Sequence, residues 1–164
     1  MSVSDALRQA EGKLSLIGDR IAMLQGKLED LLFRAQRISG AKKAGMPAQD
    51  TMFGYDLQHF RRDIRSFSQE VIALPAMIGA VERLAAFEDG AEKPAQSVMR
   101  LCNRVHKAMQ LLNDHALLAH THIREADHKI EAWYLCQEIE EMAQKTQGLP
   151  TAANKILIKV APPA

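Results

Sequence analysis

Apolar residues recur at alternating steps of three and four along the first part of the chain. This spacing places them on one face of an α-helix, as in the seam of a coiled coil. Ser2 or Ser4 can cap the start of the helix, and Gly40 is suited to end it. The pattern predicts a long helix whose apolar face packs against other helices. The residues of this first seam are Leu7, Ala10, Leu14, Ile17, Ile21, Leu24, Leu28, Leu31, Ala35 and Ile38.

A second seam follows a loop at 40–50 that contains two glycines and a proline. Pro75 lies inside this seam, where it removes one backbone donor and its ring crowds the carbonyl of Val71. The apolar positions nevertheless continue in phase past Pro75. We therefore expect one kinked helix, with a break into two helices as the alternative. The second seam is Phe53, Leu57, Phe60, Ile64, Phe67, Val71, Leu74, Ile78, Val81 and Ala85.

A third seam begins after the turn at 88–94 and passes Asn113 without a change of phase, so a single helix is expected there. A break near Asn113 is the alternative, and it would give four helices. Beyond Trp133 the seam positions are the polar residues Gln137 and Glu140. A second apolar pattern in a shifted phase starts at Ala132, which indicates a local stutter or stammer before the helix ends at Gly148. The third seam is Val98, Cys102, Val105, Met109, Leu112, Ala116, Ala119, Ile123, Ala126, Ile130 and Trp133.

The last stretch, 149–164, has a different pattern. A short run with β propensity, 155–160, precedes Pro162 and Pro163. We expect a short extended C-terminal tail that packs against its own bundle. The alternative is that the tail binds a partner protein, by adding a strand to the edge of the partner's sheet. The predicted partner-binding residues are Ile156, Leu157, Ile158 and Val160.

The three seams have similar lengths and are joined by short loops, which make consecutive helices antiparallel neighbours. The sequence therefore predicts an all-α fold over 1–148, an antiparallel up-down-up bundle of three long helices. Leu111, Leu117 and Leu118 widen the apolar face of the third helix. We expect self-association, with a dimer favoured and the third helix as one possible contact.

Composition narrows the function classes. The chain has 164 residues, and 21 basic against 20 acidic residues give a formal net charge of +1. This balance provides no overall attraction to nucleic acid or to an anionic membrane, so neither is an expected partner. The N-terminus is too polar for a signal peptide, and no stretch is apolar over the length of a membrane span.

Cys102 and Cys136 lie among apolar neighbours and are expected to be buried thiols in a cytoplasmic protein.

Four of the six histidines lie between His115 and His128. The spacing of His122, Glu125 and His128 resembles that of metal ligands on a helix. Glu125 and His128, however, lie opposite the apolar seam, where a metal site in the bundle core cannot form. Solvent-facing histidines are therefore expected, and no metal or cofactor is predicted. A metal-binding helical bundle is kept as an alternative function.

A small basic group on the second helix, Arg61, Arg62 and Arg65, is the candidate site for a polyanion. Asp56 and Asp63 lie among these arginines, so a solvated face is expected and a polyanion-binding module is the second alternative. Nucleotide-binding glycine loops and nucleophile motifs are absent, and no catalytic residue is predicted. The sequence favours a non-enzymatic interaction, scaffold or regulatory protein.

Overall fold

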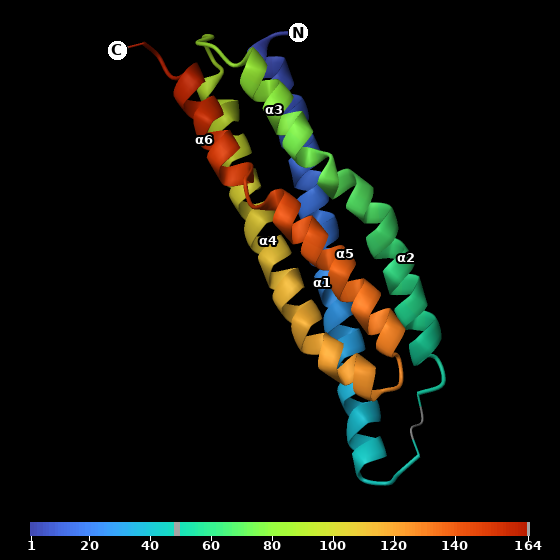
Figure 1. The fold of residues 1–164 in the computed structure, drawn as a ribbon. Coiled ribbons are helices and arrows are strands. Elements are labelled where there is room, and N and C mark those ends of the chain that lie inside the picture. Colours follow the sequence, from blue (N-terminus) through green and yellow to red (C-terminus); the bar gives the residue numbers. More distant parts are fainter. Residues whose placement is uncertain (48–49, 164) are drawn as a thin grey trace.

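The computed structural model describes residues 1–47 and 50–163. Within these residues the chain is helical and contains no strand, which confirms the all-α prediction (Figure 1). The helices are α1 (Val3–Lys43), α2 (Phe53–Ile72), α3 (Leu74–Leu84), α4 (Glu92–Glu125), α5 (Lys129–Thr146) and α6 (Leu149–Val160).

The helices stack into four columns, because α2 continues into α3 and α5 continues into α6 (Figure 1). The α1 column packs along α4, and α4 packs against α5 and α6. The α2–α3 column completes the four-column bundle: α2 contacts α5, α3 contacts α6, and both contact α1. The bundle thus has four columns instead of the three expected.

Polar contacts between columns show their directions. Ser97 Oγ donates to Glu11 Oε1 at 2.7 Å, and Arg104 donates to Asp19 at 2.8 Å. In these two pairs the α4 residue lies 86 and 85 residues further along the chain than its α1 partner. This nearly constant separation means that α1 and α4 run parallel. Arg20 pairs instead with Glu70 on α2, and Lys27 pairs with Asp63, so later residues of α1 meet earlier residues of α2. The first two columns are therefore antiparallel.

The start of α1 follows its sequence signal. The hydroxyl of Ser2 accepts a hydrogen bond from the Asp5 amide at 3.0 Å, as expected of a helix cap. Ser4 has a different role, because its amide and hydroxyl both donate to Glu88 in the connection between α3 and α4. The helix continues past the predicted end at Gly40 to Lys43.

The fourth column arises from a chain reversal that the sequence analysis missed. After α4 ends at Glu125, Asp127 adopts a positive φ of 69° and the chain turns back into α5. The prediction of one helix through Trp133 is wrong, and so is the alternative break near Asn113, which lies inside α4. The shifted apolar phase marks this hairpin and not a stutter. The residues of the new phase, Ala132, Leu135, Ile139 and Met142, are buried.

Pro75 divides the second column into two helices at Ala73. Ala73 keeps a right-handed helical backbone, and its carbonyl accepts from the Met77 amide at 3.1 Å. Val71 and Leu74 are both buried on either side of the division. The apolar phase is thus preserved as predicted, although α2 and α3 are separate helices and not one kinked helix.

The fourth column has the same construction. Pro150 lies in the first turn of α6, directly after the division at Gly148, just as Pro75 lies in the first turn of α3. The buried positions Val71, Leu74, Ile78 and Val81 correspond in order and spacing to Thr146, Leu149, Ala153 and Ile156. Because α2–α3 and α5–α6 are neighbours, the two prolines interrupt adjacent columns at the same level.

The prediction of an extended C-terminal tail is wrong, because residues 149–160 form α6. Leu149, Ala153, Ile156 and Val160 follow helical spacing and are buried against α3 and α4. This burial outweighs the local β propensity of the segment. Pro162 and Pro163 lie beyond the helix end, where they do not interfere.

Candidate interaction surfaces

The predicted strand-forming residues at the C-terminus do not form an accessible edge. Ile156 and Val160 are buried, Leu157 is half-buried, and Ile158 is 67% exposed. The α6 helix also uses its own backbone hydrogen-bonding groups, which strand addition would need. A partner that reaches this segment would contact Ile158, and a binding role for the four residues stays a prediction.

The candidate metal ligands are separated by the turn after α4. The Glu125 carboxylate accepts a hydrogen bond from Ser39 and lies 3.2 Å from Lys43, so α1 holds it. His122 Nδ1 is 3.9 Å from Glu125, whereas the His128 ring lies edge-on to Phe53 with centroids 5.4 Å apart. Across residues 1–47 and 50–163, no three His, Cys, Asp or Glu side chains are grouped so that they could hold a metal ion.

Two of the candidate polyanion-binding arginines are used in packing between α2 and α5. The Arg61 guanidinium lies over the Tyr134 ring, 5.3 Å from its centroid. Arg65 Nη2 lies 3.3 Å from Glu138 Oε1. Arg62 is exposed. Arg61 and Arg65 therefore act as contacts between columns, and only Arg62 is left without such a contact among the described residues.

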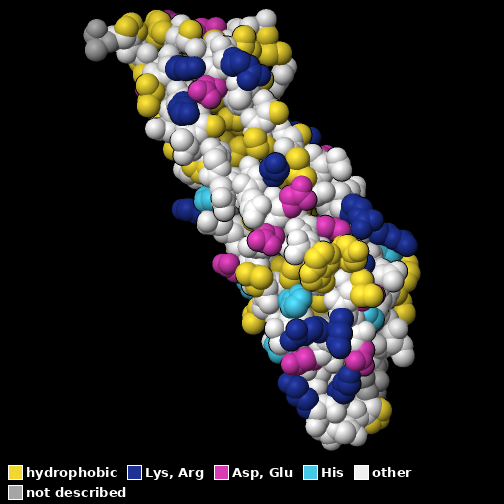
Figure 2. Space-filling model, in the orientation of Figure 1, with side chains coloured by type: hydrophobic (Ala, Val, Ile, Leu, Met, Phe, Trp, Pro, Cys, Tyr) yellow, Lys and Arg dark blue, Asp and Glu magenta, His cyan; other side chains and the backbone are white. Residues whose placement is uncertain are grey.

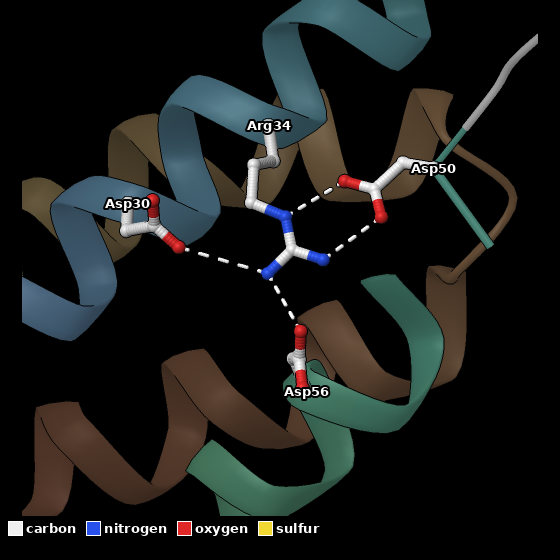
Figure 3. A network of polar contacts seen from close by, with 4 residues as sticks. All are labelled: Asp30, Arg34, Asp50 and Asp56. Carbon is white, nitrogen blue, oxygen red and sulfur yellow. Dashed lines mark hydrogen bonds and ion pairs between the residues drawn. The ribbon is translucent and has the colours of Figure 1, made fainter. Parts of the chain in front are cut away.

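A network around Arg34 fixes the connection between α1 and α2 (Figure 3). Arg34 Nε and Nη2 donate to the two carboxylate oxygens of Asp50 at 2.7 and 2.8 Å, and Nη1 donates to Asp56 at 2.8 Å. Asp30, one turn earlier on α1, lies 3.6 Å from Nη1. The bidentate geometry is the strong form of such a pair. This network attaches the connection and the start of α2 to α1.

The Arg34 network makes stability depend on pH. The hydrogen bond from Arg34 holds the pKa of Asp50 below its ordinary value. The stabilisation is therefore complete above about pH 4, the pKa of an unfolded aspartate, and is lost as the pH falls through the lower folded pKa. We expect Asp50→Asn to reduce the free energy of unfolding by about 1 kcal/mol at neutral pH and by less in acid. Thermal unfolding followed by circular dichroism across this pH range measures the difference.

Asp89→Asn is the matched control for Asp50→Asn, because Asp89 is exposed and forms no ion pair with the described residues. An equal loss of stability in both variants, or a difference that does not shrink in acid, would contradict the role of Asp50.

The two cysteines differ in their surroundings. Burial raises the pKa of the Cys102 thiol to about 12, and this side chain is fully enclosed, as expected. Cys136 is half-buried between α4 and α5, where its thiol donates to the Ala116 carbonyl at 3.2 Å. Burial raises its pKa to about 11. Both thiols are held in the protonated form, which is the unreactive one.

Several large apolar side chains are exposed on the α4–α5 hairpin; we name the outer side of the hairpin, which carries Leu117 and Trp133, the α4–α5 face. Trp133 is 52% exposed and packs edge-on against Tyr134, with ring centroids 5.0 Å apart. In Figure 2 hydrophobic side chains gather over this part of α5. Large exposed apolar patches are typical of contact sites, so this face is a candidate interaction surface. The large apolar side chains exposed on the hairpin are Leu111, Leu117, Leu118, Ile130, Trp133 and Tyr134.

The sequence identified only part of the α4–α5 face. Leu111, Leu117 and Leu118 were recognised as apolar residues beside the third seam. Ile130 and Trp133 were expected in the core, and the structure exposes both. The signal that would have placed them correctly is the competing phase at Ala132 and Leu135, since both patterns cannot face the core at once.

No helix in the part of the chain that the structure describes has the length and apolar character needed to cross a membrane. Comparison of the chain with protein-family models, curated proteins and solved structures finds no match.

Proposed function

We propose that this chain is a non-enzymatic scaffold protein that self-associates, and that the α4–α5 face is its contact surface. The observation that carries the proposal is the exposure of large apolar side chains on one hairpin, with Leu117 59% exposed and Trp133 52% exposed on its outer side. A cytoplasmic location, expected from the sequence, stays a prediction.

The energetics of the α4–α5 face favour its burial. Removing a large apolar side chain from water contributes about 1.5 to 3 kcal/mol. Tryptophan and tyrosine are enriched at the centres of protein–protein interfaces, where they supply much of the binding energy. A net charge of +1 leaves little overall repulsion between two copies. These points support self-association through this face.

Trp133→Glu is expected to abolish the dimer. The substitution places a charge at the centre of the proposed contact, where it would be desolvated without a partner. Sedimentation equilibrium should show a dimer for the unmodified chain and a monomer for the variant, with unchanged helix content by circular dichroism.

Leu16→Glu is the matched control, because Leu16 is 66% exposed on α1 and lies outside the α4–α5 face. It should dimerise like the unmodified chain. The proposal is overturned if the unmodified chain is monomeric, or if Leu16→Glu weakens association as much as Trp133→Glu.

A further inference from the structure

Four exposed charged residues of the α4–α5 hairpin lie on opposite sides of the apolar centre according to their sign. Asp114 and Glu140 lie toward one end, and Arg124 and Lys129 lie toward the other; all four are exposed. None of the four forms an ion pair with the residues that the structure describes. Asp127, the acid nearest the basic end, pairs with Lys42 of α1. The four charges are therefore available to a partner.

The register of the hairpin places these charges at comparable distances from its centre. Because Cys136 bonds to Ala116 between antiparallel helices, Trp133 lies level with Ala119, and Glu140 lies level with Leu112. At 1.5 Å per residue, Asp114 is about 6 Å before Leu118 on α4, and Arg124 is about 9 Å after it.

The charges on α5 are arranged in the same way around Trp133. Lys129 is about 6 Å before Trp133, and Glu140 is about 10 Å after it. Each helix thus carries one acidic and one basic residue, on opposite sides of the same apolar centre.

The charges and the apolar side chains also share one side of each helix. On α4, Arg124 follows Leu117 by two full turns, and Asp114 precedes Leu117 by one turn. On α5, Glu140 follows Trp133 by two turns, and Lys129 precedes it by one. In Figure 2 acidic side chains lie on the α6 side of the apolar cluster, and basic and acidic side chains lie together toward the α4–α5 turn.

We infer that the occupant of the α4–α5 face is a second copy of this chain, packed antiparallel about a two-fold axis that passes near Trp133. The inference rests on the proposed self-association and specifies its geometry. The axis lies in the interface and is perpendicular to the helices, so α4 meets α4 and α5 meets α5. Asp114 of each copy then faces Arg124 of the other, and Glu140 faces Lys129.

The antiparallel arrangement follows from charge complementarity. A two-fold axis parallel to the helices would instead pack α4 of each copy on α5 of the other. Arg124 would then face Lys129, and Asp114 would face Glu140, with like charges opposed at both ends. Opposed like charges disfavour an arrangement, whereas complementary charges fix its register. An isologous interface requires a self-complementary surface, and this face has that property only in the antiparallel orientation.

Two charge-reversed variants test the arrangement. The acidic variant, Arg124→Glu with Lys129→Glu, carries four acids on the face; the basic variant, Asp114→Lys with Glu140→Lys, carries four bases. Each variant alone is expected to dimerise at least about tenfold more weakly than the unmodified chain, a change of 1.4 kcal/mol. An equimolar mixture of the two is expected to form a heterodimer, because opposite signs then meet at every contact.

Native mass spectrometry of the mixture distinguishes the heterodimer from both homodimers by mass. The matched control is Arg8→Glu with Lys93→Glu, which changes the net charge equally at exposed sites outside the face. This control should dimerise like the unmodified chain.

The possible outcomes separate the two proposals. If Trp133→Glu is monomeric but both charge variants dimerise normally, or if their mixture forms no heterodimer, the antiparallel arrangement is overturned and self-association stands. If the unmodified chain is monomeric, both proposals fall. Formation of the heterodimer from two monomeric variants supports the antiparallel arrangement directly.

Discussion

A chain that ends at Gly148 is expected to lose most of its stability. The α6 helix fills the space between α3 and α4, where Leu149, Ile156 and Val160 are fully enclosed. Each large aliphatic side chain contributes about 1.5 to 3 kcal/mol on burial, while a whole domain is stable by only about 5 to 15 kcal/mol. Removal also uncovers the apolar sides of α3 and α4. Urea denaturation followed by circular dichroism should show a large fall in both the helix content and the midpoint.

A chain that ends at Ala161 is the control for this deletion, because it keeps all of α6. It should unfold like the full-length chain. If the chain that ends at Gly148 retained normal stability, residues 149–160 would behave as the detachable tail that the sequence suggested and not as a part of the bundle.

Phe67→Ala is expected to lower the free energy of unfolding by about 3 to 5 kcal/mol. Phe67 lies in α2 with no exposed surface, and the Arg20 guanidinium lies 4.6 Å from the centre of its ring. The substitution leaves a cavity and removes the aromatic surface beneath Arg20, which also pairs with Glu70 at 2.6 Å. Equilibrium denaturation in urea measures the change.

Phe33→Ala provides the comparison for Phe67→Ala, because Phe33 is 58% exposed on α1. Its loss should change stability by no more than about 0.5 kcal/mol. Similar effects at the two positions would show that the ring of Phe67 is not part of a tightly packed core.

The sequence predicted which side of each helix is buried better than it predicted how the helices are arranged. The seam from Leu7 to Ala35 is buried along its length, as is the seam from Phe53 to Val81. A spacing of three and four defines an apolar side in bundles of any size, so it does not reveal the number of columns. The number of columns depended on a single reversal of chain direction, at Asp127.

That reversal has a weak local signal. Residues 126–128 contain neither glycine nor proline, and the turn depends on an aspartate in the left-handed conformation. Aspartate tolerates this conformation but does not require it. The stronger information was the conflict between the phases ending at Trp133 and starting at Ala132, which a reversal resolves. The same error hid the exposure of Trp133 and thus the centre of the α4–α5 face.

The error at the C-terminus has a different cause. Ile156, Ile158 and Val160 favour strands as isolated residues, but their preference is small compared with the burial available beside α3 and α4. Leu149, Ala153, Ile156 and Val160 do follow helical steps of four and three. The local propensity of this segment favoured a strand, whereas the spacing of its apolar residues favoured a helix. The helix forms because it buries those residues beside α3 and α4.

The paired prolines interrupt the backbone hydrogen bonding of two of the four columns at one level, while α1 and α4 continue past that level without a break. Pro75 and Pro150 each lack an amide donor, so the hydrogen-bond ladders of two adjacent columns are weakened at one level, between α3 and α2 and between α6 and α5. Both chain termini lie at the α3–α6 end (Figure 1). The α4–α5 face lies beyond the interruption, toward the hairpin turn. Fraying that starts at the chain termini therefore meets the interruption before it reaches the half that carries the α4–α5 face.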